Sequence, residues 1–506
     1  MMIDLMKKFL LGLGTAVLIV GCGADISGGG VDEDADPGTA DFSVFVALGD
    51  SLTAGFADSA LYRHGQENSY PAIMAQQFAL AGGGAFNQPL MPVAATGGLT
   101  LSAVPLPVSD RLVVVPTGNP DSPVAPATIT PTVSTEIGLP LTGMFNNIGV
   151  PGARSYHVTA QNYGDALGVG GGTANPFYVR FRQAAAARMV EDAVALTPTF
   201  FVLWIGANDV LGYATSGGDG VQGAGAPPYA GENDITDPAV FPAIYSDILN
   251  GAYPTPLNTP TNKGVLVNIP DVTTIPFFTT VPHNAIPLDA TTAATVNAAF
   301  AAYNAGVTAA IGFGGMTAQE AASRQINFVA GDANPILILD EALTDLTPAN
   351  AALINMRQAT PDDYILLTAS TKLGTEQIPG NPTTVWGVTN PLIDTDVLTA
   401  AEVAIVEAAR TQFNASIKAI ADGDPNLALF DAAAKLTELN TTGISYGSGG
   451  ISSAFIQGGG FSLDGVHPTA RGYAVVANEI FSVINDAFAA NIPPVDPNEY
   501  TTVFYQ

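Results

Sequence analysis

A serine near one end of this chain and a histidine near the other have the neighbours that nucleophilic catalysis requires. Ser51 closely follows the apolar run Phe42–Leu48, and Asp464 stands three residues before His467. A histidine can take the proton of a serine hydroxyl, and a carboxylate bound to its second ring nitrogen fixes the required tautomer. These residue types predict acyl transfer, with ester hydrolysis as the reaction.

Two segments between these residues offer hydrogen-bond donors for the oxyanion that such a reaction forms. Gly149 lies in the block Asn147–Gly149, and Asn208 lies in Gly206–Asp209. A backbone N–H group and a side-chain amide can both stabilise the charge of a tetrahedral intermediate. Gly149 could instead serve only to permit a tight turn, and Asn208 could cap a helix.

Alternating apolar and helical segments indicate how these residues are positioned. Five apolar runs are typical of buried parallel strands: Phe42–Leu48, Phe145–Ile148, Thr199–Ile205, Gly264–Ile269 and Leu427–Phe430. Helical patterns occur at Gln183–Leu196, Ala290–Ile311, Thr399–Ala421 and Ala470–Ala489, and Ser69-Tyr70-Pro71 opens another helix. The alternation predicts an α/β fold, a three-layer α/β/α sandwich with a central parallel sheet.

The candidate catalytic residues follow the rule that reactive loops lie at the carboxyl ends of parallel strands. Ser51 follows the first predicted strand, Gly149 ends the second and Asn208 follows the third. Asp464 and His467 come after the last predicted strand and before the last predicted helix. All five are therefore expected at one edge of the sheet.

Two large insertions interrupt the alternation, at about residues 82–140 and 283–398. The first is rich in Gly, Pro and Thr and contains the β-like run Leu112–Val115. The second holds a long Ala-rich helix and β-like runs at Ile336–Leu339 and Tyr364–Thr368. Neither segment offers an obvious hydrophobic core of its own, so both are expected to be parts of one catalytic domain.

Four sequence blocks occur in the order found in the SGNH, or GDSL, hydrolase family, which this chain resembles over most of residues 42–490. The blocks are Gly49–Leu52, Asn147–Gly152, Gly206–Asp209 and Asp464–Pro468. The resemblance implies a flavodoxin-like fold and ester hydrolysis through an acyl-enzyme intermediate. It leaves the two insertions uncovered.

The resemblance also implies a role for each site residue. Ser51 would attack the ester carbonyl, His467 would carry the proton, and Asp464 would orient the imidazole. The backbone N–H groups of Ser51 and Gly149 and the side-chain amide of Asn208 would hold the oxyanion. No cofactor and no metal ion is expected in this mechanism.

Other residues could be mistaken for the catalytic ones. Ser445 fits the G-x-S-x-G pattern of a different hydrolase fold, but that pattern needs a strand before it and a helix after it. The remaining histidines, His64, His157 and His283, lack an acidic partner at the required spacing. We expect them to be surface or structural residues.

The composition excludes several classes of protein. The chain has 506 residues, of which 47% are hydrophobic, so it can bury a large core. Its net charge is −29 with only 16 Lys and Arg residues, which leaves no basic stripe for nucleic acid. A single cysteine excludes an intrachain disulfide framework.

That cysteine, Cys22, ends a segment typical of a bacterial lipoprotein signal peptide. Lys7 and Lys8 precede the apolar stretch Phe9–Gly21, which is too short to span a membrane comfortably. The resemblance to a lipobox implies cleavage before Cys22 and lipidation of its sulfur; an ordinary signal peptide or a buried thiol is the alternative. The protein is then expected in the cell envelope, and Gly23 favours the outer membrane.

The sequence thus divides into a signal peptide (residues 1–22), a flexible acidic linker (23–41), a hydrolase domain (42–492) and a C-terminal tail (493–506). The expected substrate is a small-molecule or lipid-like ester, and Pro276–Phe278 could line its acyl pocket or merely pack an insertion. A carbohydrate O-acetylesterase of the same family is the alternative enzyme. A catalytically inactive, lipid-anchored binding protein is the alternative from another class.

Overall fold

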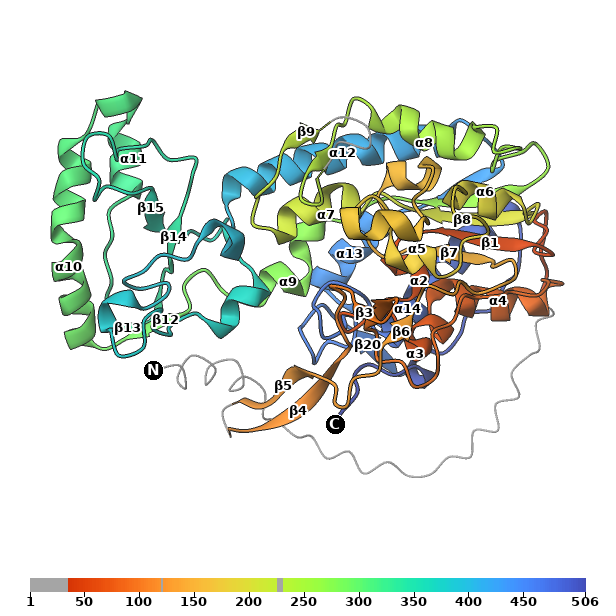
Figure 1. Ribbon diagram of the computed structural model, residues 1–506, viewed down its shortest axis with the longest axis horizontal. Coiled ribbons are helices and arrows are strands. Elements are labelled where there is room, and N and C mark those ends of the chain that lie inside the picture. Colours follow the sequence, from red (N-terminus) through yellow and green to blue (C-terminus); the bar gives the residue numbers. More distant parts are fainter. Residues whose placement is uncertain (1–34, 120–121, 225–230) are drawn as a thin grey trace.

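A five-stranded, all-parallel sheet forms the centre of the computed structural model, which describes residues 35–119, 122–224 and 231–506 (Figure 1). The strand order is β18-β11-β8-β1-β7. These strands are β1 (Phe45–Gly49), β7 (Asn147–Gly149), β8 (Phe200–Trp204), β11 (Lys263–Val267) and β18 (Leu427–Phe430). Each predicted apolar run supplies one strand, so the five predicted strands are confirmed.

Side chains alternate between the two faces of this sheet, and each face carries its own core. On β1, Val46 and Leu48 belong to one core, while Phe45 and Ala47 belong to the other. The first core is covered by α6 (Met189–Val194), α7 (Asn208–Thr215), α8 (Phe241–Asn250) and α12 (Ala400–Asp422). The second is covered by α4 (Tyr70–Leu80) and α14 (Ala470–Phe488). Because both faces are buried, each strand reads as a continuous apolar run, and the predicted α/β sandwich is confirmed.

One predicted helix is much shorter than expected. Of Gln183–Leu196 only α6 is helical, because Arg188 marks its start, where its N–H donates to the Glu191 carboxylate at 2.9 Å. The N–H of Gln183 donates to the Asp192 carboxylate at 3.2 Å, so the segment before the helix folds back against it. The Glu191 side chain thus accepts from the Arg188 N–H, a donor that a longer helix would have used in its own backbone bonding.

The first insertion forms two small sheets beside the body, which is the central sheet with the helices that cover its two faces. The strands are β2 (Leu99–Leu101), β3 (Val104–Pro105) and β6 (Thr135–Glu136) in one sheet, and β4 (Leu112–Asn119) and β5 (Ser122–Thr128) in a hairpin. The hairpin confirms the β-like run at Leu112–Val115. The C-terminal tail is held against it, since the N–H of Val114 donates to the Phe504 carbonyl at 2.7 Å and that of Gln506 donates to the Val114 carbonyl at 3.1 Å.

The second insertion forms a separate lobe, seen at the left of Figure 1, with a hydrophobic core of its own. The expectation that it lacks such a core is therefore wrong. Its main helix, α10 (Ala290–Ala309), buries Val296, Phe300 and Val307 against short strands. The lobe elements are β12 (Ile286–Leu288), α10, α11 (Ala318–Ser323), β13 (Gly331–Asn334), β14 (Leu337–Leu339), β15 (Met356–Gln358), β16 (Tyr364–Ile365) and β17 (Val397–Leu398).

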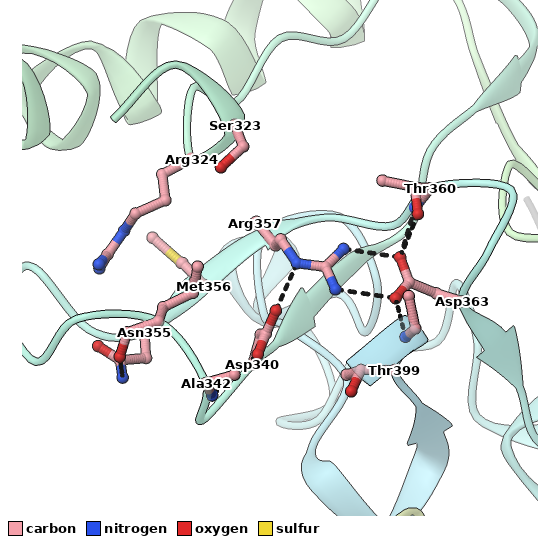
Figure 2. Close-up of polar contacts among 12 residues, drawn as sticks. Ser323, Arg324, Asp340, Ala342, Asn355, Met356, Arg357, Thr360, Asp363 and Thr399 are labelled. Carbon is pink, nitrogen blue, oxygen red and sulfur yellow. Dashed lines mark hydrogen bonds and ion pairs between the residues drawn. The ribbon is translucent and has the colours of Figure 1, made fainter. Parts of the chain in front are cut away.

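Arg357 of β15 joins this lobe to the body. Its Nε donates to Asp340 at 2.6 Å, and its two terminal nitrogens donate to both oxygens of Asp363 at 2.6 and 2.8 Å (Figure 2). Asp363 also accepts from the N–H of Ala400, the first residue of α12, at 3.0 Å. This buried, bidentate network fixes the lobe strands relative to a helix that packs on the central sheet.

The remaining elements are short. They are α2 (Ser51–Ala54), α3 (Arg63–Glu67), α5 (Pro176–Val179), α9 (Pro276–Thr279), α13 (Ala432–Thr441), β9 (Gln222–Ala224), β10 (Ile235–Thr236), β19 (Ile444–Tyr446) and β20 (Gly449–Ile451), with several 3₁₀ turns between them. Among the helices of the described ranges, none has both the length and the apolar character to cross a bilayer. Cys22, the predicted signal peptide and most of the predicted linker lie outside the described residues.

Candidate active site

Ser51, His467 and Asp464 form a continuous hydrogen-bonded chain at the carboxyl edge of the sheet. The Ser51 Oγ lies 2.9 Å from Nε2 of His467, and Nδ1 of His467 lies 2.9 Å from Oδ2 of Asp464. The ring of Phe56 packs on the imidazole with centroids 4.7 Å apart, which restricts imidazole rotation. The structure thus brings together the three residues that the sequence singled out.

The Asp464 carboxylate is buried but surrounded by donors. Its Oδ1 accepts from the Ser462 hydroxyl and from the N–H groups of Val466 and His467 at 2.8–3.0 Å, and its Oδ2 accepts from the Ser59 N–H at 2.9 Å. Burial alone would raise the pKa of Asp464, but the facing imidazole and these donors lower it to about 2. The ionised carboxylate can hold a proton on Nδ1, which leaves Nε2 free to accept the serine proton.

The loop after α2 positions Asp464, and the sequence did not single it out. Asp58 and Ser59 both adopt left-handed backbone conformations, with φ of 54° and 65°. Asp58 accepts from the Leu463 N–H at 3.0 Å and donates its own N–H to Ser462 at 2.9 Å, while burial raises the pKa of Asp58 to about 6. The strained turn aims the Ser59 N–H at the Asp464 carboxylate.

Ser51 begins α2 directly after β1, where a tight turn exposes its hydroxyl to the cleft described below. The preceding residue, Asp50, caps this turn by accepting from the Leu52 N–H at 2.9 Å. The second oxygen of Asp50 has no hydrogen-bond partner among the described residues. Burial raises the pKa of Asp50 to about 7, so a structural carboxyl of variable charge lies next to the candidate nucleophile.

Asn208 opens α7 after β8 and lines the same cleft as Ser51. Its side-chain amide donates to the carbonyl of Ala153 at 2.8 Å, which fixes the amide orientation. The second amide hydrogen has no acceptor within the part of the chain that the structure describes, and neither has the Ser51 N–H. Both groups suit the role predicted for them, stabilisation of an oxyanion.

Gly149 is not placed as the sequence suggested. Its N–H donates to Oδ1 of Asn147 at 2.9 Å, and a side chain at this position would collide with the backbone of α2. Gly149 therefore allows close packing against α2, which is neither the predicted oxyanion role nor the tight turn considered as its alternative. Gly152 is exposed, has φ of +78°, and its N–H has no acceptor among the described residues. The next residue, Ala153, accepts a hydrogen bond from Asn208, so the Gly152 N–H lies next in the chain to a residue that contacts another candidate donor.

An apolar cleft, partly open to solvent, extends from Ser51 and His467 between α13, α14 and the β19–β20 hairpin. Its apolar lining includes Leu211, Ile275, Leu436, Leu439, Ile444, Ile451 and Val475. Ser445 lies on the same hairpin and is followed by a strand instead of a helix, so it lacks the geometry of a nucleophile elbow. A cleft with this lining can hold an acyl chain.

The segment Pro276–Phe278 does not line this cleft. The N–H of Phe277 donates to the Gly465 carbonyl at 2.9 Å, so α9 supports the turn between Asp464 and His467. Phe278 is buried, with its ring 6.2 Å from that of Tyr364 in the lobe. Neither phenylalanine lines the cleft. Of the two roles considered for this segment, the structure supports packing of an insertion.

Two other histidines have structural surroundings. His157 accepts from the Arg154 N–H at 3.0 Å and stacks on Tyr163 with centroids 4.2 Å apart, and burial lowers its pKa to about 3. His64 packs edge-on against Phe504 of the C-terminal tail. A histidine held neutral in this way cannot serve as the proton carrier, which agrees with the prediction of structural roles.

Comparisons of this chain with family models, with curated proteins and with solved structures give no match. The chemistry of the site is therefore taken from its own geometry.

Proposed function

We propose that this chain is a serine ester hydrolase, a carboxylesterase or lipase of the SGNH type. The observation that carries the proposal is the chain of two 2.9 Å contacts that joins Ser51 to His467 and His467 to Asp464. A serine hydroxyl is a weak nucleophile on its own, and this arrangement supplies both the base that activates it and the carboxylate that orients the base.

The proposed reaction proceeds in two halves. In the first, His467 Nε2 takes the Ser51 proton while Oγ bonds to the ester carbonyl carbon. Collapse of the tetrahedral intermediate breaks the bond to the alcohol, which leaves with the proton from His467. In the second, a water molecule gives a proton to His467 and attacks the acyl-enzyme, and Ser51 regains the proton as the acid departs. Asp464 stabilises the imidazolium in both halves.

Three donors are proposed to hold the oxyanion: the backbone N–H groups of Ser51 and Gly152 and the side-chain amide of Asn208. Gly152 takes the role first assigned to Gly149, because the Gly149 N–H already has an acceptor. Fixed donors of this kind stabilise charge as it develops and need no reorganisation during the reaction. No step requires a cofactor.

The apolar cleft favours esters of medium or long acyl chains as substrates. Burial of each CH₂ group contributes about 0.8 kcal/mol, which corresponds to roughly a fourfold gain in affinity. An acetyl group offers little apolar surface to this lining, so the cleft disfavours the O-acetylesterase alternative. With p-nitrophenyl esters from acetate to palmitate, we expect kcat/KM to rise by up to about fourfold per CH₂ until the cleft is filled. A maximum at acetate would point to the O-acetylesterase.

Covalent labelling tests the nucleophile itself. A fluorophosphonate probe should form one adduct on the wild-type chain, and mass spectrometry should place it on Ser51. The Ser51→Ala variant should be neither labelled nor active, because no other group can form the acyl-enzyme. Ser445→Ala is the matched control and should retain both labelling and activity. An unlabelled wild-type chain would favour the inactive binding protein.

We also propose that the chain is anchored in the cell envelope through a lipid on Cys22, and that no nucleic acid is bound. The support is the basic, apolar and cysteine-terminated order of residues 1–22. Cys22→Ser should abolish incorporation of a radioactive fatty acid and release the protein from membranes. Membrane retention of that variant would contradict the anchor.

A further inference from the structure

Three carboxylates from separate segments converge where the inserted lobe meets the body. Glu341 follows β14 of the lobe, Asp394 lies on the segment that returns from the lobe, and Glu402 lies in the first turn of α12. One oxygen of each lies within 4.8 Å of an oxygen of the others. None of the three lines the cleft that contains Ser51.

The buried end of this cluster has an oxygen without a partner. Glu402 is only 3% exposed, Asp394 is half-buried and Glu341 is exposed. Oε2 of Glu402 accepts from the N–H and the hydroxyl of Thr399 at 2.7 and 2.8 Å, as in a helix capping box. Oε1 has no hydrogen-bond donor among the described residues, and the Glu341 carboxylate is a close neighbour of Glu402. Helix capping therefore explains one oxygen of Glu402 and leaves the other unexplained.

No basic side chain neutralises the cluster within the described part of the chain. The nearby lobe cations are used elsewhere: Arg357 pairs with Asp340 and Asp363, and Lys372 pairs with Asp396. The three clustered carboxylates have no ion pair of their own in the described ranges. Close carboxylates without a counter-charge are unfavourable at this depth.

Three carboxylates that lie this close together, without a counter-charge among the described residues, need a shared proton or a bound cation to lower their free energy. A divalent cation would satisfy all three groups at once.

We propose that Glu341, Asp394 and Glu402 bind one calcium ion that fastens the lobe to the body. Ca²⁺ takes oxygen ligands at about 2.3–2.6 Å, so two ligands on opposite sides of the ion lie about 4.8 Å apart. The cluster stays within that limit. Water and backbone carbonyls would complete the shell. Mg²⁺, which requires shorter bonds of about 2.0–2.1 Å and near-octahedral geometry, is the competitor to be separated by experiment.

Independent hydrogen bonds hold the backbone around these ligands in place. In Figure 2, Arg357 joins Asp340, the residue before Glu341, to Asp363, which in turn accepts from Ala400 at the start of α12. The same frame therefore fixes the lobe segment and the helix turn that carry two of the proposed ligands. Preorganisation of this kind lowers the cost of bringing the carboxylates together.

The cluster also lies against the loop that follows α7. Gly218, with φ of +85°, approaches so closely that a side chain there would collide with the Glu402 carboxylate, and Asp219 adds further negative charge. Because α7 begins with Asn208, the ion would brace the far end of the helix that carries a proposed oxyanion donor. Calcium is therefore expected to stabilise the lobe junction without taking part in the chemistry.

Metal binding can be measured directly on the full chain, whatever its enzymatic activity. The protein is stripped with EDTA and kept in about 0.1 M KCl, which screens its high net charge. Isothermal titration calorimetry should find one Ca²⁺ site per chain, and Ca²⁺ should raise the thermal unfolding temperature. Mg²⁺ should bind at least about tenfold more weakly.

Two substitutions and a matched control distinguish binding at this site from unspecific binding of Ca²⁺ to a negatively charged chain. Glu402→Gln keeps a residue that can complete the capping box, and Glu341→Gln changes an exposed side chain that folding does not need. Each should weaken Ca²⁺ binding about tenfold or more and remove the rise in unfolding temperature. Asp362→Asn, which removes the same charge from another exposed lobe carboxylate, should leave both unchanged.

The same measurements can overturn the proposal. Absence of a stoichiometric Ca²⁺ site on the wild-type chain would do so, as would many weak sites that respond equally to all three substitutions. Equal affinity for Mg²⁺ would overturn the assignment to calcium. Because the readout is binding and thermal unfolding, failure here would leave the proposed hydrolase activity untouched.

Discussion

The loop that carries Asp464 and the lobe junction both bury carboxylates, but the surroundings of these carboxylates affect their negative charge in opposite ways. Asp464 receives hydrogen bonds on both oxygens from Ser59 and from the Ser462–His467 turn, and its pKa falls to about 2. Glu402 receives hydrogen bonds on one oxygen only, and burial raises its pKa to about 8. Both side chains are shielded from water, so the difference comes from their neighbours: Asp464 faces an imidazole and several donors, whereas Glu402 faces the Glu341 carboxylate.

This difference explains why the two regions suit different tasks. A carboxylate whose charge is satisfied by fixed backbone donors stays ionised and does not move, which is what orientation of an imidazole requires. A carboxylate with an unused oxygen must obtain a proton or a cation from the medium, which suits a site that responds to ions.

The largest effect on turnover should come from removal of the Asp464 charge, which hydrogen bonds on both oxygens stabilise. In Asp464→Asn the amide favours the tautomer of His467 with its proton on Nε2, so Ser51 can no longer be deprotonated. We expect kcat to fall about 10⁴-fold with KM little changed, as is typical for this triad. Initial rates on the best p-nitrophenyl ester measure the effect, with circular dichroism as the control for folding. Turnover within tenfold of wild type would exclude an orienting role for Asp464.

A smaller loss of turnover is expected from removal of a donor to the oxyanion, whose charge exists only during the reaction. Asn208→Ala removes one of three proposed oxyanion donors and leaves the N–H groups of Ser51 and Gly152 in place. We expect kcat to fall about 10²–10³-fold, equivalent to about 3–4 kcal/mol of transition-state stabilisation. Asn208→Asp, which keeps the shape but replaces the donor with an acceptor, should be at least as poor. A change confined to KM would assign Asn208 to substrate binding instead.

Most of the body could be predicted because its signals are local. Each central strand is a continuous apolar run, such as Phe200–Trp204, and each run ends at the edge where the site lies. The lobe core could not be predicted in this way, because its strands are only two to four residues long and its contacts are distant in sequence. Tyr303 of α10, for example, donates to the carbonyl of Met356, 53 residues later, at 2.8 Å.

Within the candidate site, the side chains could be predicted from the sequence, whereas the backbone groups could not. Ser51 and His467 could be predicted because their side chains carry the chemistry. Gly149 and Gly152 could not be told apart, because both offer only an N–H, and the choice depends on whether Asn147 already accepts it. The left-handed turn that positions Asp464 likewise has no side-chain pattern, since strain at non-glycine residues is a property of the folded chain.

The smallest effect should appear at Asp50, which combines features of both regions: one oxygen caps α2 and the other has no partner. Burial raises its pKa from about 4 in the unfolded chain to about 7 in the folded chain. Over that range the unfolded chain loses its proton first, so this group lowers the free energy of unfolding as pH rises from 4 to 7.

Asp50→Asn keeps an oxygen that can cap the turn and removes the titration. Urea unfolding at pH 5 and pH 8 should therefore show that the variant gains stability relative to wild type at the higher pH, on the order of 2 kcal/mol. A variant whose difference from wild type is the same at both pH values would mean that Asp50 has a normal pKa. In that case burial with a donor on one oxygen only would not be sufficient to shift the pKa of a carboxyl in this fold, and the contrast with Asp464 would need another cause.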